Sequence, residues 1–183
     1  YEYRARFYLS EEERKWAKQL MDVFPKPVIA ICTQSKEAVK NWPLDHWVEL
    51  IDSISPDFSL IQLGDDKEPE LEKVIRFAGK HTMRESASLL SRANFFIGPD
   101  SLLMHVANGL DVKSIVIFGG SRPTDCFGYE QNINLATAPE CSPCWIHDGH
   151  ETCEHKIKCM NNINQAQVLD AIVSLSTTKT KIN

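Results

Sequence analysis

The sequence predicts an α/β protein built on a doubly wound parallel sheet of the Rossmann-like type. Apolar runs that read as buried strands alternate with helical patterns along most of the chain, as in a sheet covered by helices on both faces. The clearest unit runs from Ala93 to Thr124: an apolar run, a Gly-Pro-Asp-Ser break, a helix, a second apolar run and a Gly-Gly-Ser-Arg-Pro loop. Both breaks follow strands, at the sheet edge where open α/β proteins bind ligands.

Two of the expected helices begin with the same capping signature. Ser10 is followed three residues later by Glu13, and Thr82 by Glu85, a pattern that predicts a helix start. The first helix places Trp16, Ala17, Leu20 and Val23 on its apolar side, and Pro25 ends it. The other expected elements are strands at 28–32, 58–63 and 132–136, and helices from Trp42-Pro43 to Ile54, at 69–77 and at 165–175.

Length and composition predict one domain with a sizeable core. The chain has 183 residues, of which 43% are hydrophobic. We expect a linker and helix at 1–24, a Rossmann-like domain at 25–175 that includes a Cys-rich loop at 139–162, and a frayed tail at 176–183. Because the first residue is Tyr rather than Met, we treat the chain as a piece of a longer protein.

Charge and hydropathy exclude two classes of partner. The net charge of −5 argues against a general nucleic-acid binder, which needs a basic face. No apolar run reaches the ~18 residues of a membrane span, and the first ten residues lack the apolar core of a signal peptide. We therefore expect a cytoplasmic protein with no transmembrane segment.

Several polar residues follow the expected strands and suit a nucleotide-type ligand. The helix that begins near Asp100 and Ser101 offers its first N–H groups to phosphate, as does the Gly119-Gly120-Ser121 loop. Asp100 has two interpretations: a helix cap or a contact to sugar hydroxyls. The remaining candidates also have interpretations without a ligand. Lys40 fits a solvated loop lysine, His105 a core residue, and Glu68 a surface acid in a turn.

Three motifs at strand ends carry a family resemblance. They are Lys40-x-Trp42-Pro43, Gly98-x-Asp100-Ser101 followed by His105 and Ala107, and Phe118-Gly119-x-Ser121-x-Pro123. From about Val28 to Leu175, the chain resembles the C-terminal half of the glycosyltransferase family 9 heptosyltransferases, enzymes of the two-domain GT-B architecture. The resemblance implies binding of a nucleotide sugar, typically ADP-heptose, for inverting transfer to lipopolysaccharide core or to another glycan or protein acceptor, with no cofactor required for transfer.

The resemblance also implies a set of donor-binding residues: Thr33, Gln34, Lys40, Glu68, Asp100, Ser101, His105, Gly119 and Ser121. The N-terminal domain of the family, which holds the acceptor and the catalytic base, has no counterpart in this sequence. We therefore expect no catalytic residue here, an inactive fragment, and a full-length protein that is peripheral at the inner membrane. One departure is Leu102, which stands where the family pattern has Gly and reshapes the expected sugar-phosphate pocket.

The cysteines form a second constellation, Cys141-x2-Cys144-x8-Cys153-x5-Cys159. The opening C-x2-C spacing is typical of tetrahedral thiolate sites, which favours a structural zinc or iron ion in a reducing compartment. Disulfides, mixed redox states and free thiols are the alternatives. His147, His150 and His155 lie in the same loop and are able to replace a thiol.

Two other functions fit the sequence. In one, Cys141 to Cys159 builds a metal-finger interaction or assembly module, and the nucleotide site on its Rossmann-like scaffold is degenerate. In the other, the chain is half of a nucleotide-sugar epimerase, which shares the fold.

Overall fold

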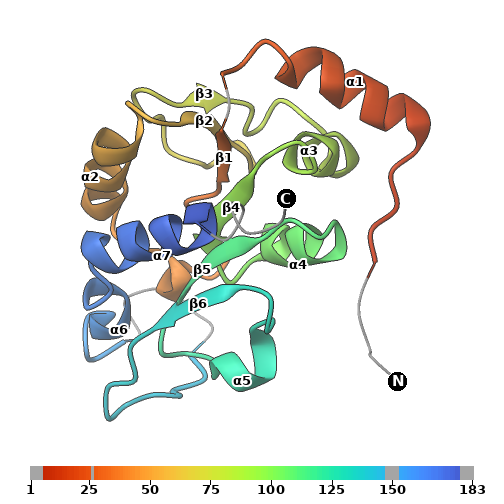
Figure 1. Ribbon diagram of the computed structural model, residues 1–183. Coiled ribbons are helices and arrows are strands. Elements are labelled where there is room, and N and C mark those ends of the chain that lie inside the picture. Colours follow the sequence, from red (N-terminus) through yellow and green to blue (C-terminus); the bar gives the residue numbers. More distant parts are fainter. Residues whose placement is uncertain (1–5, 26, 147–152, 178–183) are drawn as a thin grey trace.

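The computed structural model of the chain describes residues 6–25, 27–146 and 153–177. Its centre is a six-stranded sheet in the order β3-β2-β1-β4-β5-β6, and all neighbouring strands pair in parallel (Figure 1). The chain builds the sheet outward from β1 in one direction and from β4 in the other. The loops after β1 and β4 therefore diverge at a topological switch point, where such sheets bind ligands.

The strands are β1 (Val28–Ile31), β2 (Ser59–Gln62), β3 (Ile75–Arg76), β4 (Phe95–Pro99), β5 (Ser114–Phe118) and β6 (Ile133–Ala136). Every residue of β1, β4 and β5 is buried, which explains their continuous apolar sequence. This arrangement confirms the predicted α/β class and five of the strands.

The predicted helix at 69–77 is wrong. The segment is a series of turns that ends in the two-residue edge strand β3. Lys73 has a φ of 61°, in the left-handed region that a right-handed helix does not contain. Leu71 and Val74, which lie within the predicted helix, pack against the core from this turn instead. Two partly buried side chains three residues apart in a loop therefore give the same sequence pattern as the apolar side of a helix.

The helices are α1 (Glu11–Met21), the 3-10 helix η1 (Ala38–Lys40), α2 (Leu44–Ile54), α3 (Met83–Leu90), α4 (Leu102–Gly109), α5 (Thr124–Phe127), α6 (Lys158–Asn161) and α7 (Gln165–Thr177). They enclose two clusters of buried apolar side chains. One cluster contains residues of α2, α6 and α7, and the other contains residues of α1, α3 and α4 (Figure 1). The two clusters contain alternate residues of β1 and β4, which places them on opposite faces of the sheet.

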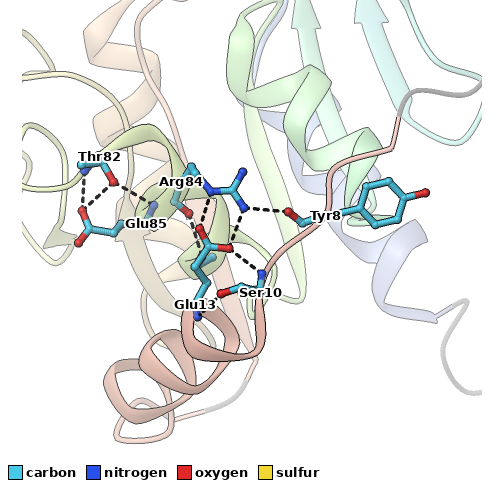
Figure 2. Close-up of polar contacts among 7 residues, drawn as sticks. Tyr8, Ser10, Glu13, Thr82, Arg84 and Glu85 are labelled. Atoms are coloured by element: carbon cyan, nitrogen blue, oxygen red, sulfur yellow. Dashed lines mark hydrogen bonds and ion pairs between the residues drawn. The ribbon is translucent and has the colours of Figure 1, made fainter.

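The N-terminal segment is fastened to α3. Both predicted capping boxes are present, from Ser10 to Glu13 and from Thr82 to Glu85. Arg84 connects the two helices: its guanidinium lies 2.5 Å from one oxygen of Glu13 and 2.8 Å from the other, and donates to the Tyr8 carbonyl at 2.9 Å (Figure 2). Helix α1 ends at Met21. The expectation that Val23 lies on its apolar side is therefore wrong, and Val23 is exposed.

The C-terminal end also differs in one detail. Ser176 and Thr177, expected in a frayed tail, form the last residues of α7, while 178–183 fall outside the described residues. The described helices include none that combines the length and apolar character of a membrane span.

Candidate functional site

A cleft of about 1000 Å³ opens at the carboxyl ends of β1, β2 and β4. The loop after β1 supplies one wall through residues 34–38 together with Lys40 and Asn41. Residues 64–68, after β2, and the start of α4 supply the others. The cleft therefore lies at the switch point, at the sheet edge that the sequence predicted, but among the described residues the loop after β5 does not line it.

Lys40 and Asp100 meet across this switch point. The Lys40 Nζ lies 2.9 Å from Asp100 Oδ2 and 3.2 Å from Glu37 Oε1. The side chains of Lys40 and Asp100 are only 10% and 8% exposed, so each charge depends on its partner to offset the loss of hydration. The pair places a cation and a carboxylate together in the cleft. Sequence analysis identified both residues but not their contact.

The amino terminus of α4 borders the same cleft. Ser101 occupies the N-cap position, as expected for Asp100 or Ser101, but its side chain makes no capping hydrogen bond, and the interpretation of Asp100 as the cap is wrong. Asp100 instead pairs with Lys40. Leu102 and Leu103 begin the helix and line the cleft. The first N–H groups of a helix have no intrahelical acceptor, so this end suits an anion.

Leu102 projects its side chain into the open. It is 63% exposed and is part of the cleft wall. A side chain at this position occupies space that a glycine would leave to a ligand, next to the helix N–H groups. That Leu102 reshapes this part of the pocket remains a prediction.

The surroundings of Gly98 explain why the second motif has a glycine at this position. A Cβ added there would lie 2.5 Å from Phe96 Cζ and 3.0 Å from the Cys32 carbonyl oxygen, both closer than normal contacts. The glycine thus lets the ends of β4 and β1 approach and brings the Lys40 and Asp100 loops together.

Glu68 is a buried hub for the loop after β1. Its carboxylate accepts from the Thr33 backbone N–H at 2.9 Å, the Thr33 hydroxyl at 2.5 Å and the Gln34 N–H at 3.1 Å. Gln62 Nε2 and the Cys32 thiol each lie 3.2 Å away as further donors. Both carboxylate oxygens are therefore bound to protein groups. Sequence analysis listed Glu68 as a donor-binding residue with a surface acid as the alternative; the surface interpretation is wrong because Glu68 is buried, and the network was not detected.

The network also fixes its neighbours. Thr33 is buried and directs its hydroxyl to Glu68, whereas Gln34 lines the cleft. Burial raises the pKa of the Cys32 thiol well above its ordinary value, and the Glu68 carboxylate raises it further. Cys32 therefore stays a protonated, unreactive thiol at the floor of the cleft.

His105 lies on the exposed side of α4 rather than in the core. It lines the cleft, and its Nδ1 lies 2.8 Å from the Tyr129 hydroxyl. Burial raises the pKa of Tyr129, and the Asp100 carboxylate raises it further. Tyr129 thus belongs to the surroundings of Asp100. Sequence analysis missed it because it follows α5 and belongs to no motif.

Gly119 and Ser121 are not among the residues that line the cleft. Both are buried beneath the Cys-rich segment. A Cβ on Gly119 would lie 2.8 Å from Met160 Sδ, and the Ser121 carbonyl accepts from the Trp145 N–H at 3.0 Å. The loop after β5 therefore packs against Met160 and Trp145 through Gly119 and the Ser121 carbonyl.

The four cysteines of the Cys-rich segment are free thiols. Burial raises the pKa of Cys159 in the first place, and the charges of Cys144 and Cys153 raise it further, which indicates that these three lie near one another. Cys141 instead borders a second cavity of about 510 Å³ with His155. Among the described residues, no three His, Cys, Asp or Glu side chains are arranged to hold a metal ion. His147 and His150 lie outside the described residues.

A parallel sheet of this order, with a charged cleft at the switch point, defines an α/β protein of the Rossmann-like type. The sequence identifies the family. Residues 2–155 match the model of glycosyltransferase family 9 (heptosyltransferase), and the chain belongs to this family.

The curated relatives are heptosyltransferases. Lipopolysaccharide heptosyltransferase 1 of Escherichia coli K12 is 29% identical over 109 residues, which cover 55% of this chain and 34% of that protein. Lipooligosaccharide heptosyltransferase 2 of Campylobacter jejuni is 26% identical over 156 residues, or 76% of this chain and 48% of the relative. The chain thus spans less than half the length of these relatives.

Solved structures share the fold. Escherichia coli ADP-heptose lipopolysaccharide heptosyltransferase II superposes with a TM-score of 0.74 at 18% identity, over 96% of this chain and 54% of that one. The iron-containing dodecameric glycosyltransferase TibC of enterotoxigenic Escherichia coli gives a TM-score of 0.73 at 24% identity, over 85% and 46%.

Proposed function

We propose that this chain is the donor-binding half of an inverting GT-B glycosyltransferase and binds a nucleotide sugar of the ADP-heptose type. The observation that carries the proposal is the Lys40–Asp100 pair at the switch point, beside the open amino terminus of α4. Family membership supports the reaction class, and solved relatives were determined with ADP-heptose and with ADP.

In this proposal, different residues of the cleft bind the diphosphate and the sugar of the donor. Lys40 and the first N–H groups of α4 hold the diphosphate, which carries the negative charge that develops on the leaving group during transfer. Asp100, released from Lys40 by the phosphate, accepts hydrogen bonds from sugar hydroxyls. Gln34, Ser101 and His105 complete the set, whereas Thr33 and Glu68 act by shaping the loop that presents Gln34. Gly119 and Ser121 support the cleft from behind.

The acceptor and its base belong to a separate N-terminal domain in this proposal. A positioned base deprotonates the acceptor hydroxyl, which we take to be part of lipopolysaccharide core or of another glycan or protein. This chain alone then binds donor without transferring sugar, and no cofactor is needed for transfer. We place the full-length protein in the cytoplasm, peripheral at the inner membrane.

Ligand-induced stabilisation tests donor binding. ADP, UDP and ADP-heptose are titrated into the wild-type chain and into Lys40→Met while the thermal midpoint is followed. A ligand at 100 times its Kd stabilises the native state by about 2.7 kcal/mol, so the wild type shifts upward with its cognate nucleotide and Lys40→Met shifts less. If no nucleoside diphosphate at 10 times a millimolar Kd shifts the wild type, the donor-binding proposal is wrong.

A structural metal in the Cys-rich segment is the second part of the proposal. Thiolates are the donors that zinc and iron prefer, and the pKa of Cys159 indicates that Cys144 and Cys153 are close to it. Because the described side chains do not form a ready cluster, binding requires Cys141, Cys144, Cys153 and Cys159 to rotate together. The likeness to an iron-containing relative favours this possibility.

Elemental analysis of the purified chain, with thiol titration, tests the metal. We expect close to one equivalent of zinc or iron, lost in a Cys144→Ser/Cys159→Ser variant. Metal-free protein in which these four thiols titrate in addition to the exposed Cys126, or in which they form two disulfides, would contradict it. One equivalent of metal without any nucleotide stabilisation would instead favour the metal-finger interaction module.

A further inference from the structure

Arg122 lies in the loop after β5, between the cleft and the Cys-rich segment. Its guanidinium carbon is 5.5 Å from the centre of the Phe127 ring and 5.4 Å from the centre of the Trp145 ring. Its side chain is 11% exposed. Two aromatic rings and near-complete burial hold the cation in one place, where cation–π attraction is strongest.

The same guanidinium faces the cleft wall. Arg122 Nη2 lies 3.6 Å from Glu37 Oε2, and the other oxygen of Glu37 lies 3.2 Å from Lys40 Nζ. Lys40 in turn contacts Asp100. Cations and carboxylates therefore alternate along one row, Arg122, Glu37, Lys40 and Asp100. The row leads from Trp145 in the Cys-rich segment to the centre of the cleft.

The aromatic contacts are fixed by backbone hydrogen bonds. Cys144 donates its N–H to the Gly120 carbonyl at 3.2 Å, and Trp145 donates to the Ser121 carbonyl at 3.0 Å. These bonds attach the Cys-rich segment to the two residues that precede Arg122. The position of the Trp145 ring over the guanidinium thus follows from the backbone, and a shift of the segment moves Arg122.

The charges decide what Arg122 does for the cleft. Glu37 contacts both Lys40 and Arg122. The positive charge of Arg122 therefore partly cancels the negative potential that Glu37 produces at Lys40. Without Arg122, Lys40 still faces the carboxylates of Glu37 and Asp100, and the positive charge of the guanidinium beside Glu37 is lost. The field at the Lys40 ammonium then becomes less favourable for an anion, and this effect is strong because the groups are poorly hydrated.

We propose that Arg122 is a positioning residue for the phosphate end of the donor site. It holds and partly neutralises Glu37, which leaves Lys40 available to a diphosphate, and Phe127 and Trp145 keep it in place. The inference rests on the proposed function, because it assigns Lys40 to the diphosphate. It makes the Cys-rich segment a determinant of nucleotide affinity, although none of the segment's described residues lines the cleft.

A double-mutant cycle on ADP affinity tests the proposal. Calorimetry is applied to the wild type, Arg122→Gln, Glu37→Gln and the double variant. Arg122→Gln weakens ADP binding about tenfold, or 1.4 kcal/mol, and the double variant recovers most of the loss because the unneutralised carboxylate is gone. Arg122→Lys keeps most of the affinity. Arg6→Gln is the matched control, because it removes an exposed cation paired with Asp111 and leaves the affinity unchanged.

Two outcomes of the cycle overturn the inference. One is an Arg122→Gln variant that binds ADP as tightly as the wild type. The other is an equal loss in Arg122→Gln and in the double variant, which would indicate a packing role that does not involve Glu37.

Hydrogen exchange supplies a readout that needs no nucleotide. The Lys40 and Asn41 N–H groups bond to the carbonyls of Glu37 and Ala38. Arg122→Gln and Trp145→Leu should speed their exchange while α1 stays as in the wild type. If the wild-type chain does not bind ADP, the proposed function fails. Hydrogen exchange alone then tests whether Arg122 and Trp145 stabilise the loop that carries Lys40. Unchanged exchange at 37–41 would then overturn the inference.

Discussion

The Lys40 ammonium lies 2.9 Å from the Asp100 carboxylate and joins the loop after β1 to the loop after β4. The two strands are neighbours in the sheet although 63 residues separate β1 from β4 along the chain, from Ile31 to Phe95. The pair has two consequences: each partner stabilises the other in the free protein, and an anionic ligand competes with Asp100 for Lys40.

Replacing Lys40 separates these consequences. Lys40→Met leaves two carboxylates, those of Glu37 and Asp100, without this cation, and we expect a loss of about 1–3 kcal/mol in the free energy of unfolding. Asp100→Asn in the same background should recover part of the stability but not the ADP affinity. Urea denaturation and calorimetry provide the two measurements. Lys73→Met, which breaks an exposed pair with Asp52, is the control and should cost well under 1 kcal/mol.

Glu68 should act mainly through stability. Glu68→Ala removes the acceptor of the Thr33 and Gln34 backbone N–H groups, and each buried donor left unsatisfied should lower the free energy of unfolding by about 1–3 kcal/mol. Glu70→Ala, at an exposed neighbouring position, is the control. A Glu68→Ala chain as stable as the wild type, but unable to bind ADP, would show instead that the carboxylate contacts the ligand directly.

Leu102 should influence the sugar more than the nucleotide. Leu102→Ala and Leu102→Gly open the wall of the cleft next to the first turn of α4. We expect both to tighten binding of ADP-heptose relative to ADP, since ADP lacks the group that needs the space. Leu102→Gly should also cost about 1 kcal/mol of stability relative to Leu102→Ala. Equal changes for the two ligands would place the sugar elsewhere.

The contact between Glu13 and Arg84 should make the attachment of α1 sensitive to acid. The hydrogen bond from Arg84 holds the pKa of Glu13 below its ordinary value of 4.5, and the Ser10 N–H lowers it further. Since the folded pKa is the lower one, this stabilisation is present above about pH 4.5 and is lost as pH falls through the folded pKa.

Unfolding of Glu13→Gln against pH tests this statement. The variant should be less stable than the wild type at pH 7, and the difference should shrink as the pH falls below about 4.5 towards the lower pKa of the folded Glu13 carboxyl. Glu11→Gln, in the same first turn, serves as the control. A difference that stays constant down to pH 3 would contradict the sign of the shift.

Local signals were sufficient for most of the fold. The capping boxes at Ser10 and Thr82 depend on residues three positions apart, so the sequence displays them directly. The buried strands β1, β4 and β5 read as continuous apolar runs. The error at 69–77 arose where two apolar residues pack from turns, because burial does not require a helix.

The sequence by itself determined five of the six strands and the longer helices between them, the placement of Lys40 and Asp100 in the loops after β1 and β4, and that of His105 on the helix after Asp100. Only the tertiary structure decided which of these groups meet. Glu68 lies 35 residues from Thr33 and was absorbed into a buried network, and the Cys-rich segment covered Gly119 and Ser121. The physical reason is that the order of strands in the sheet, and not distance along the chain, sets which loops are neighbours.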